Sequence, residues 1–82
     1  MYQISINRKA KKFIDKLTPD DRRRIVSAIM KLPSGDTKKL KGHENLYRLR
    51  VGEYRIIYTK NDMKLIICVI DAGNRGQIYN RY

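Results

Sequence analysis

Three arginines between Leu46 and Tyr58 have the charge and the spacing to bind phosphate groups. Arg48 and Arg50 alternate with apolar residues, and in a β-strand this alternation places both arginines on one face. Gly52 can take the positive φ of a tight hairpin turn, after which Arg55 returns on the same face. A guanidinium group stays charged and forks onto phosphate oxygens. The stretch therefore predicts a β-hairpin with an apolar face and an arginine-bearing face that can stabilise charge on a phosphate.

A basic segment precedes the hairpin, from Asp36 to Glu44, and we expect it to be a loop. Its Lys38, Lys39 and Lys41 are candidates for binding nucleic acid, through phosphate contacts that do not read sequence. The same segment contains His43, the only histidine of the chain. Histidine titrates in the range of an acid–base catalyst, but single surface histidines are common without any such role.

The overall charge points to anionic partners. The chain of 82 residues has 19 lysines and arginines against 8 aspartates and glutamates, which gives a net charge of +11. Nucleic acid, an anionic membrane surface or an acidic protein would be attracted to such a body. No long apolar run and no signal pattern is present, so we expect a cytoplasmic protein with no membrane span. Residues 1–82 are expected to form one domain, with Cys68 as a buried hydrophobe and with no cofactor or metal.

Two helices are predicted in the first half of the chain. Asn7 is a candidate N-cap, and apolar residues follow it at helical spacing. A second helix begins at Thr18, where the threonine caps, Pro19 fits the first helical position and acids follow. It should end near Pro33. The apolar residues of the two helices are Ala10, Phe13, Ile14 and Leu17, then Ile25, Val26, Ile29, Met30 and Leu32.

The remaining strands complete an α+β fold. Tyr2 to Ile6 alternates and predicts an N-terminal strand, and Lys64 to Ile70 is almost continuously apolar, as in a central strand. A break is expected at Asp71 to Gly76. The order is an N-terminal strand, a two-helix hairpin and a three-stranded antiparallel meander. The helices should cover one face of the sheet, leaving the arginines on the other.

Three segments resemble the RelE/ParE superfamily of toxins from bacterial and archaeal toxin–antitoxin pairs. They are Leu40-Lys41-Gly42, the hairpin from Leu46 to Arg55, and Gly73-Asn74-Arg75-Gly76-Gln77-Ile78-Tyr79. The resemblance covers nearly the whole chain, and the Arg-x-Arg before the turn with the Tyr-Arg after it is its most specific part. It implies a RelE-like fold and an acidic antitoxin, which would fold onto the toxin and neutralise its arginines.

The resemblance also implies one of two activities. RelE-like members cleave messenger RNA in the ribosomal A site, by attack of the ribose 2′-hydroxyl on the adjacent phosphate. ParE-like members inhibit DNA gyrase and are not known as nucleases. A basic RNA- or DNA-binding module without toxicity is a third reading. We expect the free toxin to be a monomer and its complex with antitoxin to be heteromeric.

Catalytic roles carry over by resemblance at individual positions. Arg55 matches the residue that contacts the scissile phosphate in RelE-like toxins, and Arg75 matches a second cation near the phosphate and leaving group. Tyr79 matches a tyrosine that stacks on or orients the substrate. Arg48 stands where RelE-like enzymes often have a catalytic lysine, and Arg50 where another cation lies.

Two departures bear on the enzymatic reading. Leu46 occupies the place of a further family lysine, so one cation is missing. Arginine is also a poor general base, because its pKa exceeds about 12. Candidate acids or bases are Glu53, His43 or a neighbouring tyrosine, with the ribosome as another source. The plain alternative is that Arg48 and Arg50 only keep an exposed sheet face soluble.

Overall fold

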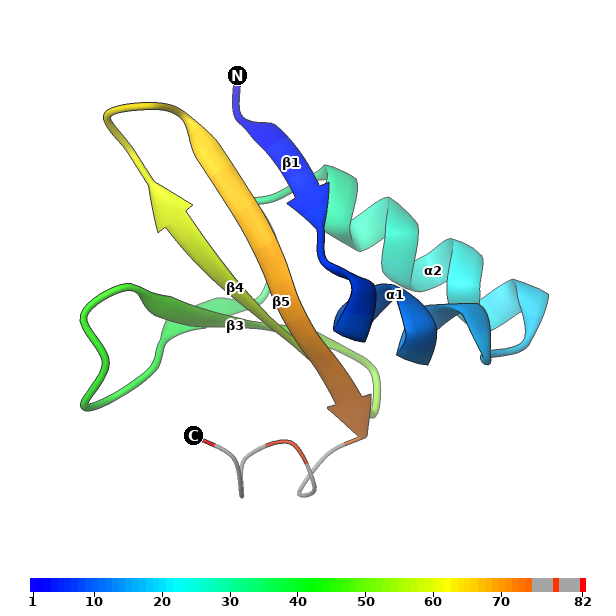
Figure 1. Cartoon of the computed structure of the whole chain (residues 1–82). Helices are drawn as coiled ribbons and strands as arrows, with labels where there is room; N and C mark the ends of the chain where they lie inside the picture. The colour runs from blue at the N-terminus through cyan, green and yellow to red at the C-terminus, as the bar shows by residue number, and fades with distance from the viewer. Residues whose placement is uncertain (75–77, 79–81) are drawn as a thin grey trace.

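The computed structural model describes residues 1–74 together with Ile78 and Tyr82 (Figure 1). Its elements are β1 (Gln3–Ile6), α1 (Arg8–Asp15), α2 (Pro19–Met30), β2 (Thr37–Lys39), β3 (Leu46–Val51), β4 (Tyr54–Asn61) and β5 (Ile66–Asn74). The strands form one sheet in the order β1-β5-β4-β3-β2, in which β1 runs parallel to β5 and every other pair is antiparallel. The predicted α+β fold, with a mainly antiparallel sheet, is confirmed.

Both helices begin where the sequence predicts. The Asn7 side chain accepts a hydrogen bond from the backbone N–H of Ala10 at 2.9 Å, and Thr18 Oγ1 accepts one from the N–H of Asp21 at 3.3 Å. Each cap satisfies an N–H that has no partner within its helix. The two helices lie together on one side of the sheet (Figure 1). Within the described ranges, no helix has the length and apolar character to cross a membrane.

The main core lies between the helices and the sheet. Its fully or nearly buried members are Ala10, Ile14, Ile25, Ile29, Leu32, Leu49, Val51, Tyr54, Ile56, Tyr58, Ile67, Val69 and Ala72. Tyr54 and Tyr58 are thus core aromatics, as their alternation with apolar residues predicts. Ile57, which faces away from the helices, is also fully buried. Both faces of β4 are therefore covered at its centre.

The segment between α2 and β3 differs from the predicted loop, because Thr37–Lys39 forms the edge strand β2. It pairs with β3, and Thr37, Lys38 and Lys39 lie opposite Leu49, Arg48 and Tyr47. A lysine pair has little β-propensity and no apolar alternation. The pairing arises from hydrogen bonds to the free edge of β3, which a local pattern does not reveal.

The last strand is longer than predicted and runs through the expected break at Asp71. A register shift lies between Ile57 and Tyr58 on β4, which pair with Asp71 and Val69. Ile70 is therefore an extra residue on β5, and the strand continues to Asn74. Asp71 is tolerated in the sheet because its carboxylate has partners, described below.

Candidate nucleic-acid interface

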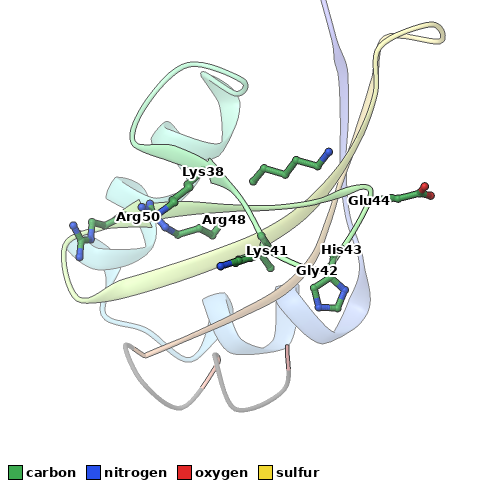
Figure 2. Close-up of a pocket in the computed structure, with 9 residues that line it drawn as sticks. Lys38, Lys41, Gly42, His43, Glu44, Arg48 and Arg50 are labelled. Carbon is green, nitrogen blue, oxygen red and sulfur yellow. The ribbon is translucent and has the colours of Figure 1, made fainter.

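A groove of about 900 Å³ lies over β2, the loop that follows it and β3. It is lined by Lys38, Lys39, Leu40, Lys41, Gly42, His43, Glu44, Arg48 and Arg50. We call it the basic groove, because five of these residues are lysine or arginine and only one is acidic. In Figure 2 the carboxylate of Glu44 points away from Arg48 and Arg50. The lining thus contains all four predicted nucleic-acid-binding residues together with Arg48 and His43. Lys39 lies opposite Tyr47 and leaves the other face of β2 from Lys38.

Strand register places the cations of the groove. Lys38 lies directly opposite Arg48 across the β2–β3 pair, so both side chains leave the same face of the sheet. The loop between the strands is closed by a hydrogen bond from the N–H of Leu40 to the carbonyl of Leu46, at 2.8 Å. Gly42 turns the loop with a φ of 83°, which a residue with a side chain rarely adopts. Edge pairing therefore gathers cations that are about ten positions apart in sequence.

Arg55 takes a different place from the other two arginines of the hairpin. It lies directly opposite Arg50 across β3 and β4, on the predicted face. Its side chain is nevertheless buried, at 2% exposure, and the lining of the basic groove among the described residues does not include it. Its Nη1 donates hydrogen bonds to the carbonyls of Gly52 at 2.8 Å and Tyr54 at 2.9 Å. The guanidinium thus braces the hairpin turn as well as carrying charge.

The candidate acids and bases are separated by the fold. His43 lines the basic groove, and its ring meets that of Tyr82 edge-on, with centroids 6.2 Å apart. Glu53 stands in the exposed turn between β3 and β4, outside the lining of the groove. Of these two, only His43 lies beside the cations.

Two neighbouring tyrosines are poorly suited to act as bases. The hydroxyl of Tyr54 donates to Asp21 Oδ2 at 2.8 Å, and this bond raises the pKa of Tyr54. Burial raises the pKa of Tyr58. A raised pKa makes the phenolate rarer near neutral pH. Both residues therefore serve packing, which agrees with their places in the core.

The Tyr54–Asp21 bond predicts a pH effect on stability. Because the pKa of Tyr54 is raised in the folded state, its contribution is present below about pH 10 and is lost as pH rises through the folded pKa. Tyr54→Phe removes the group, so the free energy of unfolding should fall less steeply above about pH 10 than in the wild type. Urea unfolding between neutral and strongly alkaline pH measures this slope. Equal slopes for the two proteins would contradict the expectation.

The remaining predicted residues, Arg75 and Tyr79, lie outside the described residues. A further buried charged residue, Asp71, is not among the residues predicted for the site. Its side chain is 2% exposed, and Oδ2 lies 3.3 Å from Lys9 Nζ and accepts a hydrogen bond from the hydroxyl of Tyr82 at 3.1 Å. The available signal was a lone acid directly after an apolar strand. A carboxylate buried at such a position requires charged or hydrogen-bonding partners.

Comparison with known proteins identifies the family. Residues 4–79 match the model of the ParE toxin of type II toxin–antitoxin systems, parDE. No curated protein matches the chain.

Three solved structures share the fold and at least a quarter of the sequence. The archaeal RelE–RelB complex from Pyrococcus horikoshii OT3 matches with a TM-score of 0.74 and 27% identity, over 93% of this chain and 97% of that chain. The RelB–RelE antitoxin–toxin complex from Methanococcus jannaschii matches with a TM-score of 0.74 and 27% identity, over 94% and 96%. The intact RelBE toxin–antitoxin complex from E. coli matches with a TM-score of 0.70 and 26% identity, over 90% and 96%. The chain therefore belongs to the ParE toxin family of type II toxin–antitoxin systems, within the RelE/ParE superfamily.

Proposed function

We propose that this toxin is a ribosome-dependent endoribonuclease that cleaves messenger RNA in the ribosomal A site. The observation that carries the proposal is the basic groove, which gathers five cations beside one histidine. The similarity to RelE proteins supports it. Such a target implies a cytoplasmic site of action.

The reaction would be an internal transesterification. The 2′-oxygen bonds to the adjacent phosphorus while the bond from phosphorus to the 5′-oxygen breaks, which gives a 2′,3′-cyclic phosphate and a 5′-hydroxyl. A base takes the proton of the 2′-hydroxyl, and an acid returns a proton to the leaving oxygen. The developing negative charge must be stabilised by donors already in place. Arg48 and Arg50 would supply these donors, and His43 is the candidate for proton transfer.

The other candidates would act around this centre. Lys38, Lys39 and Lys41 would bind phosphates on either side of the cleaved bond. Arg55 would add positive potential from the neighbouring strand, directly opposite Arg50, while its guanidinium holds the turn. By family resemblance, Arg75 would contact the phosphate and leaving group, and Tyr79 would orient the substrate.

Dependence on the ribosome follows from what the groove offers. It is rich in charge, but His43 is the one histidine in its lining, and histidine is the side chain that most often acts as a general acid or base. Holding the 2′-hydroxyl in line for attack can contribute several orders of magnitude to the rate. We propose that the ribosome supplies this alignment, together with part of the proton transfer.

The second candidate function is inhibition of DNA gyrase without nuclease activity. It is favoured by the family model that matches, which is that of the ParE toxin. It is also compatible with the buried state of Arg55.

One pair of assays separates the two functions. Purified toxin is added to ribosomes that carry a messenger with a defined A-site codon, and new RNA ends are mapped, with naked RNA as control. Gyrase supercoiling is measured with the same preparation. Cleavage within the A-site codon that is absent on naked RNA supports the nuclease, whereas inhibited supercoiling without cleavage refutes it.

The groove also predicts how RNA binding depends on salt. For single-stranded RNA, the slope of log K against log salt is about −0.7 per phosphate neutralised. Lys38→Ala should therefore weaken binding at low salt and make the slope shallower by about 0.7. Fluorescence anisotropy with a short RNA measures both quantities. Lys64→Ala, which removes an exposed lysine from the β4–β5 turn, is the matched control and should keep the wild-type slope.

We further propose an acidic antitoxin as the partner of this chain. A second groove, of about 340 Å³, lies between α2 and β3. Its lining includes the apolar residues Ala28, Leu49 and Val51, three cations and one acid; the charged residues are Arg24, Lys31, Arg50 and Asp36. An acidic segment with apolar anchors would fit both features. Light scattering should show a monomeric free toxin and a heteromeric complex after co-expression with the antitoxin.

A further inference from the structure

Asp36 lies between Arg48 and Arg50, the two arginines that line the basic groove. Arg48 Nη1 donates to Asp36 Oδ1 at 3.3 Å and to the Asp36 carbonyl at 3.0 Å. Arg50 Nη1 lies 3.9 Å from Asp36 Oδ2. Each carboxylate oxygen thus faces a different guanidinium group.

The backbone fixes Asp36 in this place. Its carbonyl also accepts the N–H of Arg50 at 2.9 Å, which ties the residue to β3 immediately before β2 begins. The preceding Gly35 has a φ of 114°, which orients the chain as it enters the sheet. These backbone bonds do not depend on the Asp36 side chain. A change of that side chain should therefore leave the strand pairing intact.

The carboxylate has two opposing effects on the groove. It restrains Arg48, whose side chain is only 16% exposed, and so limits the directions in which the guanidinium can point. It also places a negative charge beside Arg48 and Arg50. Asp36 itself lines the second groove, which shares Arg50 with the basic groove, so its charge acts on the basic groove from the border between the two. The first effect favours a fixed arrangement at the reacting phosphate. The second weakens the attraction for RNA as a whole.

We propose that Asp36 is a positioning residue, which holds Arg48 and Arg50 in place for cleavage at the expense of RNA affinity. The inference rests on the proposed nuclease function of the same groove. It predicts that RNA affinity and cleavage rate change in opposite directions, because loss of the carboxylate should tighten RNA binding and slow cleavage. A residue that only stabilised the fold would weaken both.

The test compares Asp36→Asn with Asp15→Asn. Asp15 lies on α1 and pairs with Lys11, and its side chain is 49% exposed against 54% for Asp36, so each variant removes one similarly exposed negative charge. Binding is measured with a short single-stranded RNA, and cleavage as the single-turnover rate on programmed ribosomes at saturating toxin. Nitrogen-15 NMR of the arginine side chains reports how freely the guanidinium of Arg48 rotates.

Asp36→Asn should bind RNA about two- to threefold more tightly, as expected for removal of one charge some ångströms from a phosphate. It should cleave about tenfold or more slowly, with faster rotation of Arg48. Asp15→Asn should match the wild type in cleavage and in Arg48 rotation. Asp36→Glu, which restores the charge, should recover part of the rate.

Three outcomes would overturn the inference. Asp36→Asn could behave like Asp15→Asn in every measurement. It could instead lose binding and cleavage together with a lower free energy of unfolding, which indicates a structural role. Unchanged rotation of Arg48 would also refute positioning. A wild type that does not cleave refutes the nuclease proposal alone, because RNA affinity and Arg48 rotation still test the role of Asp36.

Discussion

Arg48→Ala is expected to lower the rate of ribosome-dependent cleavage about a hundredfold or more, the usual effect of removing one preorganised donor from a developing oxyanion. Arg48 lies opposite Lys38 in the basic groove and is held by Asp36 through two hydrogen bonds. Such a guanidinium needs little reorganisation to meet a phosphate. The single-turnover rate on programmed ribosomes measures the loss.

The fold should survive this change. The Arg48–Asp36 ion pair has a carboxylate that is 54% exposed, and exposed pairs contribute about 1 kcal/mol or less. Arg48→Lys keeps the positive charge but loses the bidentate hydrogen bonding of the guanidinium, and it should retain part of the activity. Lys64→Ala controls for the loss of one positive charge elsewhere. A folded Arg48→Ala protein that cleaves at the wild-type rate would remove Arg48 from the proposed mechanism.

Local signals were sufficient for much of the fold. The caps at Asn7 and Thr18 act within one helical turn of their partners, so the sequence alone places both helix starts. The Gly52 turn, with a φ of 59°, joins two strands whose alternation assigns each side chain to a face. Tyr54 and Tyr58 accordingly lie in the main core. Each of these features depends on neighbours along the chain.

Features that depend on residues far apart in the chain could not be predicted from local sequence patterns. Strand β2 exists because the edge of β3 accepts it, and β5 passes through Asp71 because Lys9 and Tyr82 satisfy that carboxylate. Neither condition leaves a periodic pattern. The end of β5 therefore depends on partners of Asp71 that lie far away in the sequence.

The candidate site shows the same division. The alternation of side chains along the strand assigns Arg48 and Arg50 to the face opposite the helices, and the observed strand register agrees with this assignment. The alternation of side chains along a strand cannot distinguish an exposed arginine from a buried one, and Arg55 is buried on that face. Nor could it find Asp36, which meets the arginines only after β2 has paired with β3.

Arg55→Ala is expected to reduce the free energy of unfolding by about 2–3 kcal/mol, because it removes two charge-assisted hydrogen bonds to buried or partly buried carbonyls. This corresponds to a decrease of about 10–20 °C in Tm for a chain of this size. Arg50→Ala is a matched control, since Arg50 lies directly opposite on β3 with its side chain 50% exposed. It should change stability by about 0.5 kcal/mol or less. Thermal and urea unfolding compare the two.

The pair of variants also decides how a loss of activity at Arg55 should be interpreted. The family resemblance predicts a phosphate contact for Arg55, and in the structure its guanidinium donates to the carbonyls of Gly52 and Tyr54. Cleavage is therefore measured well below the Tm of Arg55→Ala, where the variant is folded. If Arg55→Ala cleaves at the wild-type rate at a temperature where it is folded, the role of Arg55 is to hold the turn. If the folded variant still fails to cleave, Arg55 acts at the phosphate. Equal stability of the Arg55 and Arg50 variants would contradict the bracing role, because the carbonyls would then not need the guanidinium.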